Sequence, residues 1–93
     1  MISRAARRAS RALEVEAALG EADTQAALDI LELVEFAWHD CYREITPSDD
    51  VIDDILVCSR GSLARFASAA RLAVEDFRDL RMAADAIRAA ANP

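Results

Sequence analysis

The sequence predicts an all-α fold, a three- or four-helix bundle with a long C-terminal helix, in a chain of 93 residues that forms one domain (1–93). Only two glycines and two prolines interrupt the chain, whereas alanine, the strongest helix former, occurs 21 times. Apolar residues recur three or four positions apart in every long segment, and no segment has the pattern of a strand. These observations predict helices at about 3–19, 24–44, 47–59 and 62–91.

The first helix, 3–19, is expected to end at Gly20, because glycine commonly terminates helices. One of its faces is basic, with arginines three and four residues apart: Arg4, Arg7, Arg8 and Arg11. The opposite face consists mostly of small apolar residues, and we expect it to pack against the rest of the protein: Ile2, Ala6, Ala9, Leu13 and Ala17.

The second helix, 24–44, is expected to begin at Asp23 or Thr24, either of which can cap its first turn. Its apolar residues are spaced by three and four positions and predict a buried stripe: Ala27, Leu31, Val34, Trp38, Cys41 and Ile45. Because Cys41 lies on this stripe, it is expected to be an inert buried thiol. The opposite side is predicted to be exposed and mostly acidic.

The third helix, 47–59, has the clearest start signal in the chain. Thr46 is predicted as its N-cap, Pro47 as its first helical residue and Asp49 as the acid of a capping box. Its end leaves two alternatives open, because Gly61 either separates the third and fourth helices or only kinks one long helix. We favour a break.

The last helix, 62–91, has the most regular pattern, which continues over four heptads and is typical of a coiled coil or a long bundle helix. At 1.5 Å per residue it would be about 40–45 Å long, more than the preceding helices can cover. We therefore expect its distal half to pack against a second chain. The predicted oligomer seam consists of Phe66, Ala70, Ala73, Phe77, Leu80, Ala84 and Ile87.

A homodimer is also expected from the size of the chain. A domain this small buries only about 60% of the surface of its unfolded chain, which makes it marginally stable alone. The sequence has no metal or disulfide signature that would add stability, so a second copy is the simplest source of further burial.

The net charge of −6 divides into three blocks: residues 1–13 carry +4, residues 14–54 carry −12, and residues 55–93 carry +2. The basic first helix and the acidic middle block can pair within one chain or between two. We predict that Arg4, Arg7, Arg8 and Arg11 bind an acidic protein partner. Nucleic acid is an unlikely partner, because the acidic block repels phosphate.

Several chemistries are excluded by missing residues. The chain has no lysine for a Schiff base or a phosphate loop, and its two glycines stand too far apart to form a glycine-rich loop. No cofactor is expected.

The basic N-terminus is not followed by the apolar stretch of a secretory signal, and no apolar run reaches the length of a membrane span. With two unpaired thiols, a cytoplasmic location is expected. The abundance of Ala, Arg and Asp without Lys suits a bacterial genome of high GC content.

Two acidic pairs suggest a metal site. Glu32 and Glu35 lie three residues apart in one helix, and Asp50 and Asp53, followed by Asp54, lie in the next. Carboxylates from two neighbouring antiparallel helices can converge on one divalent cation. The pattern resembles the ExxE…ExxD motif of MazG-type nucleotide pyrophosphohydrolases, although the second pair here has Asp where that family commonly has Glu. The resemblance implies Mg²⁺-dependent hydrolysis in a helical bundle; a solvated acidic face and helix capping are the structural alternative.

The single histidine supports two further hypotheses. Glu35 and His39 lie four residues apart and could contribute to a di-iron site only if a symmetric dimer doubled the ligands. His39, Asp40 and Cys41 are consecutive, so on a helix their side chains diverge and cannot form a catalytic triad. No catalytic residue is therefore predicted. We expect a small non-enzymatic interaction or regulatory module that homo-oligomerises and binds another protein, with the pyrophosphohydrolase as the alternative.

Overall fold

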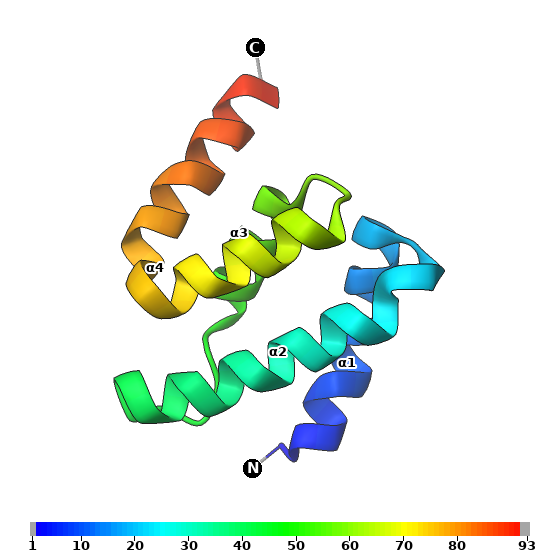
Figure 1. The fold of residues 1–93 in the computed structure, drawn as a ribbon, viewed down its shortest axis with the longest axis vertical. Helices are drawn as coiled ribbons and strands as arrows, with labels where there is room; N and C mark the ends of the chain where they lie inside the picture. Colours follow the sequence, from blue (N-terminus) through cyan, green and yellow to red (C-terminus); the bar gives the residue numbers. More distant parts are fainter. Residues whose placement is uncertain (1, 92–93) are drawn as a thin grey trace.

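The computed structural model describes residues 2–91 and contains four helices in this range: α1 (Arg4–Leu19), α2 (Glu21–Tyr42), α3 (Asp49–Ser59) and α4 (Leu63–Ala91) (Figure 1). The described residues include no strand. The predicted all-α fold with a long last helix is confirmed. Among the described residues, none of these helices carries an apolar stretch long enough to cross a bilayer.

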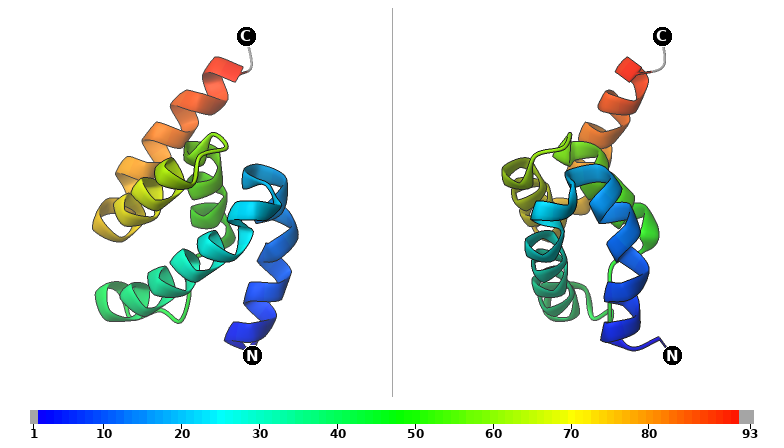
Figure 2. Two further views of the ribbon diagram at one scale, coloured as in Figure 1. Left: turned by 45° about the vertical axis from the view of Figure 1, so that its right-hand side comes forward. Right: turned by 90° about the vertical axis from the view of Figure 1, so that its right-hand side faces the viewer.

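The helices form two layers. In Figure 1, α2 and the first half of α4 lie in front, and the edge-on view in Figure 2 shows α1 and α3 behind them. The core between the layers is assembled from all four helices, with the following large side chains almost completely buried: Val15, Leu28, Leu31, Trp38, Ile52, Ile55, Phe66 and Leu80.

The turn between α1 and α2 is a single residue. Gly20 ends one helix and starts the next, with φ 90° and ψ 162°, a conformation that is open to glycine and strained for other residues. Helix α2 therefore begins three residues earlier than predicted, and capping by Asp23 or Thr24 is wrong. Thr24 lies inside the helix, where its hydroxyl donates a 2.8 Å hydrogen bond to the carbonyl oxygen of Gly20.

The predicted capping box at the start of the third helix is also wrong. Helix α3 begins at Asp49 with Ser48 as N-cap, and Pro47 is buried outside the helix. Thr46 does not cap this helix; its Oγ1 accepts a 3.0 Å hydrogen bond from Nη2 of Arg11. The break at Gly61 occurs as favoured: α3 ends at Ser59, and Gly61 has φ 79° before α4 starts.

Helix α1 packs with the face opposite to the predicted one. The side that carries the arginines faces α2, together with the fully buried Val15. Ile2 and Leu13, expected to pack, are 65% and 80% exposed, and the alanines of their stripe are exposed as well. Alanine offers little area to bury, whereas the arginine face gains both Val15 burial and ion pairs to α2. The expected apolar contact of this helix is therefore wrong.

Cys41 and Ile45 are exposed, so the predicted buried stripe is wrong at its C-terminal end. The buried side continues from Trp38 to Tyr42 instead, whose rings lie 4.4 Å apart. The chain then leaves the helix at Arg43, which has a left-handed conformation with φ 59°. A thiol at position 41 thus points away from the core.

Helix α4 is interrupted at Asp76, whose φ of −162° and ψ of 96° are not helical. Oδ1 of Asp76 accepts hydrogen bonds from the backbone N–H groups of Arg78 (3.0 Å) and Asp79 (3.3 Å), so Asp76 caps a new helical segment. The carbonyl oxygen of Val74 would accept from Arg78 in a continuous helix. Here it accepts a 2.9 Å bond from the hydroxyl of Tyr42. The expectation of an uninterrupted helix is wrong.

The kink brings the second half of α4 back along α3, so the chain covers most of its own seam. Five seam residues are buried without a second copy: Phe66, Ala70, Ala73, Leu80 and Ala84. Phe77 is 37% exposed, and Ile87 is half-buried. Leu80 and Ala84 of the distal half are thus covered within the chain, contrary to the expectation that the preceding helices are too short to reach them. Self-association stays a prediction, and it requires a surface other than these five positions.

Candidate functional site

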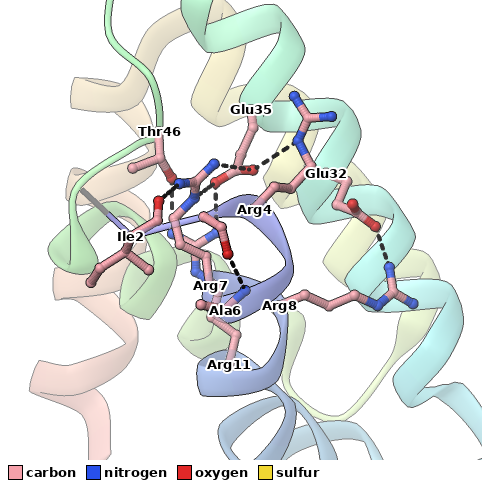
Figure 3. Close-up of polar contacts among 10 residues, drawn as sticks. Ile2, Arg4, Ala6, Arg7, Arg8, Arg11, Glu32, Glu35 and Thr46 are labelled. Atoms are coloured by element: carbon pink, nitrogen blue, oxygen red, sulfur yellow. Dashed lines mark hydrogen bonds and ion pairs between the residues drawn. The ribbon is translucent and has the colours of Figure 1, made fainter.

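Three of the four arginines of the predicted partner surface converge on Glu35, which is only 3% exposed (Figure 3). Arg7 donates to both of its oxygens, from Nε to Oε2 at 2.5 Å and from Nη2 to Oε1 at 3.1 Å. Arg11 donates from Nη1 at 3.3 Å, and Nε of Arg4 lies 3.8 Å away. Two-pronged contact of this kind is the strongest form of an arginine–carboxylate pair.

The environment of Glu35 keeps this carboxylate ionised. Burial alone would raise its pKa, but hydrogen bonds from Arg7 and Thr46 and the charges of Arg7 and Arg11 outweigh burial and lower the pKa below its ordinary value. Conversely, the hydrogen bond to Glu35 raises the pKa of Arg7. A group held in this way is not available as a general acid near neutral pH.

The other arginines of α1 are also engaged within the chain. Arg8 donates to Oδ1 of Asp29 and to Oε1 of Gln25, both at 2.8 Å, and forms an ion pair with Glu32. The guanidinium of Arg4 lies over the ring of Phe36, 4.2 Å from its centroid. An external acidic partner that used Arg4, Arg7, Arg8 and Arg11 would therefore have to displace contacts to α2.

A second buried carboxylate, Asp54, was predicted only as a possible metal ligand. It is 1% exposed and accepts hydrogen bonds from Nε of Arg81 (2.7 Å) and Nη2 of Arg88 (2.8 Å). These bonds raise the pKa of both arginines and attach the second half of α4 to α3. The sequence contained a signal for this pair: Asp54 interrupts the apolar side between Val51 and Ile55, and the two arginines are seven residues apart.

The structure does not bring the five predicted metal ligands together. Glu32 and Glu35 face α1, whereas Asp54 faces α4, and all three are paired with arginines. Asp50 lies 3.8 Å from Nη2 of Arg81, and Asp53 is exposed. Within residues 2–91, no three His, Cys, Asp or Glu side chains are grouped so that they could hold a metal ion.

His39 has no role in a buried site. Its side chain is 68% exposed, and Nδ1 lies 3.7 Å from Oδ1 of Asp40, also exposed. Residues 2–91 assemble neither a di-iron cluster nor a triad around it.

A groove of about 790 Å³ lies between α1 and residues 44–53, which include the start of α3. Its apolar lining includes Ile2 and Ile45, which are 65% and 51% exposed. Four exposed carboxylates also line it: Glu14, Glu44, Asp49 and Asp53. Two arginines of α1, Arg7 and Arg11, line it too, and Glu35 compensates one of their two positive charges, so negative charge still predominates at the groove. The groove was missed at the sequence level because it depends on how residues 44–53 pack against α1; we refer to it as the acidic groove.

Comparison with protein families, with curated proteins and with solved structures finds no match for this chain. The function must therefore be argued from the groups described above.

Proposed function

We propose that this chain is a small helical interaction module without catalytic activity, which self-associates and binds another protein. The observation that carries the proposal is that the buried carboxylates are paired within the chain, whereas several large apolar side chains are exposed. The best candidates for chemistry, Glu35 and Asp54, are bound by arginines of the same chain. Large apolar side chains are exposed instead, including Leu13 at 80%, Leu33 at 66% and Met82 at 71%.

The acidic groove supports a partner of defined chemistry. Its lining offers Ile2 and Ile45 for apolar contact, and its four carboxylates attract positive charge. A segment with apolar residues on one side and lysine or arginine on the other matches both features. The partner we propose is therefore a basic amphipathic segment of another protein, rather than the acidic partner expected from the arginines alone.

The test measures binding of a synthetic amphipathic helix of leucine and lysine by calorimetry. The variant Glu14→Gln/Asp53→Asn removes two groove charges that make no hydrogen bond or ion pair among the described residues. We expect it to bind about two- to thirtyfold more weakly, since exposed charge contacts contribute about 0.2–1 kcal/mol each and two are removed. Added salt should weaken binding to the unmodified chain.

The matched control is Glu16→Gln/Asp40→Asn, which removes the same two kinds of charge from exposed positions outside the groove. It should bind the peptide as the unmodified chain does. Equal losses in the two double variants would mean that only the net negative charge attracts the peptide, and the groove would then not be the site.

A further inference from the structure

The two flanks of α2 differ in chemistry. The flank that faces α1 carries Gln25, Asp29 and Glu32, all bound by Arg8. Ile30 and Leu33 lie beside the first half of α4, and the positions one turn before and after them on the same side of α2 are also apolar: Ala26 and Ala37. Because these positions are three or four residues apart, they form one continuous stripe along the helix.

This apolar flank and the first half of α4 enclose a shallow groove of about 400 Å³. Ile30, Leu33 and Val34 line it from α2, and Ala67, Ala70 and Val74 line it from α4. Leu33 is 66% exposed, so a large apolar side chain stands at its edge with no cover from the described chain. The helices that form the groove lie side by side on the front of the molecule (Figure 1).

The charged residues at this groove are Arg71 and Glu75, one turn apart on α4. They form an ion pair at 2.6 Å, but their side chains are 82% and 55% exposed, so both can make further contacts. One cation and one anion side by side form a patch that is complementary to itself. A two-fold axis between them would run a second α4 antiparallel to the first. Each Arg71 would then face the partner's Glu75, as an interface between identical surfaces requires.

We infer that this groove is the interface of a homodimer, with Leu33 and Val74 of both copies at its centre and two Arg71–Glu75 pairs at its rim. The inference rests on the self-association in the proposed function and names the surface that performs it. This surface differs from the predicted seam, most of which the chain covers itself; of the five buried seam residues only Ala70 also lines this groove. The acidic groove lies on α1 and residues 44–53, so the dimer leaves it open to another protein.

The test reverses the charge of Arg71 or of Glu75 and measures the mass of each variant by light scattering. In a dimer of Arg71→Glu, the new carboxylate would face the partner's Glu75 at both contacts and repel it. In a dimer of Glu75→Arg, the new guanidinium would face the partner's Arg71 at both contacts and repel it. We expect each variant alone to have the 10.1 kDa mass of one chain, whereas the unmodified chain has twice that mass. Mixing the two variants should restore the dimer, because both contacts then join opposite charges. Restoration on mixing requires a contact between chains and cannot come from the pair within one helix.

Two controls keep the outcome clear. Arg65→Glu changes an exposed arginine of the same helix outside the groove and should remain dimeric. Leu33→Ser removes apolar area from the groove and should weaken dimerisation without lowering the melting temperature of the separated chain. An unmodified chain that stays at the mass of one copy would overturn both the self-association and this interface. A dimer that both charge variants leave intact would overturn the interface alone.

Discussion

Glu35 and Asp54 are the two buried carboxylates of the described residues, and the chain neutralises them in different ways. Glu35 is held by Arg7 and Arg11, whose side chains are themselves only 14% and 11% exposed. The arginines that hold Asp54 are 46% and 38% exposed. Water can replace part of the contacts around Asp54, but it has little access to those around Glu35. The packing of α1 against α2 should therefore depend more strongly on Glu35 than the packing of α4 against α3 depends on Asp54.

The largest effect is expected for Glu35→Ala. This substitution leaves Arg7 and Arg11 charged and poorly hydrated, and breaking a buried pair from one side costs about 3 kcal/mol of unfolding free energy. Urea unfolding followed by circular dichroism measures the loss. Glu32→Ala is the matched control, because Glu32 is 32% exposed and pairs with one arginine only. A similar loss in both variants would contradict the distinction between buried and exposed members of this network.

The same network predicts how stability depends on pH. The pKa of Glu35 is lower in the folded chain than its ordinary value of 4.5. The contribution of ionised Glu35 to the unfolding free energy is therefore complete above pH 4.5. It is lost as the pH falls through the folded pKa, because protonation of Glu35 then favours the unfolded chain. The stability difference between the unmodified chain and Glu35→Gln should be constant above pH 4.5 and should shrink below it. A difference that stays constant down to pH 3 would contradict the lowered pKa.

A smaller and more local effect is expected for Asp54→Asn. The amide keeps the size of the side chain but loses the charge that binds Arg81 and Arg88, so we expect a loss of about 1.5 kcal/mol. Amide hydrogen exchange should accelerate in residues 77–91 more than in residues 63–75, because only the second half of α4 is attached to Asp54. Asp53→Asn, at the exposed neighbouring position, should change neither segment. Equal acceleration along all of α4 would mean that the two halves unfold together.

A still smaller loss of unfolding free energy is expected when the hydrogen bond from Tyr42 at the Asp76 kink is removed. Tyr42→Phe removes only the hydroxyl that donates to the carbonyl oxygen of Val74, and one hydrogen bond contributes about 1 kcal/mol. The ring contact with Trp38, at 4.4 Å between centroids, is kept. A stability within error of the unmodified chain would show that the cap by Asp76 holds the kink without help from Tyr42.

The sequence was sufficient for the approximate positions of the helices and for the breaks at glycine, but not for the N-caps of α2 and α3. Helix ends at Gly20 and Gly61 follow from the conformations that glycine permits, and the positions of the four helices follow from residue spacing. Features decided by distant residues could not be predicted in this way. The inward face of α1 is set by Arg7 and Glu35, which are 28 positions apart. The apolar register of the last helix continues through Asp76 and does not indicate the kink, at which Tyr42 donates to the carbonyl oxygen of Val74, 32 positions away.

The smallest effect concerns metal ions and separates the proposed module from a pyrophosphohydrolase. A metal bound by the folded chain raises its stability by mass action, by about 2.7 kcal/mol when the free ion is at one hundred times its dissociation constant. Glu32, Glu35 and Asp54 are paired with arginines, so Mg²⁺ would have to displace those cations and offset the cost of breaking each pair. We therefore expect millimolar Mg²⁺ or Mn²⁺ to change the melting temperature no more than NaCl does at the same ionic strength. A larger rise with Mg²⁺ that Glu32→Gln abolishes would favour the enzyme and contradict the interaction module.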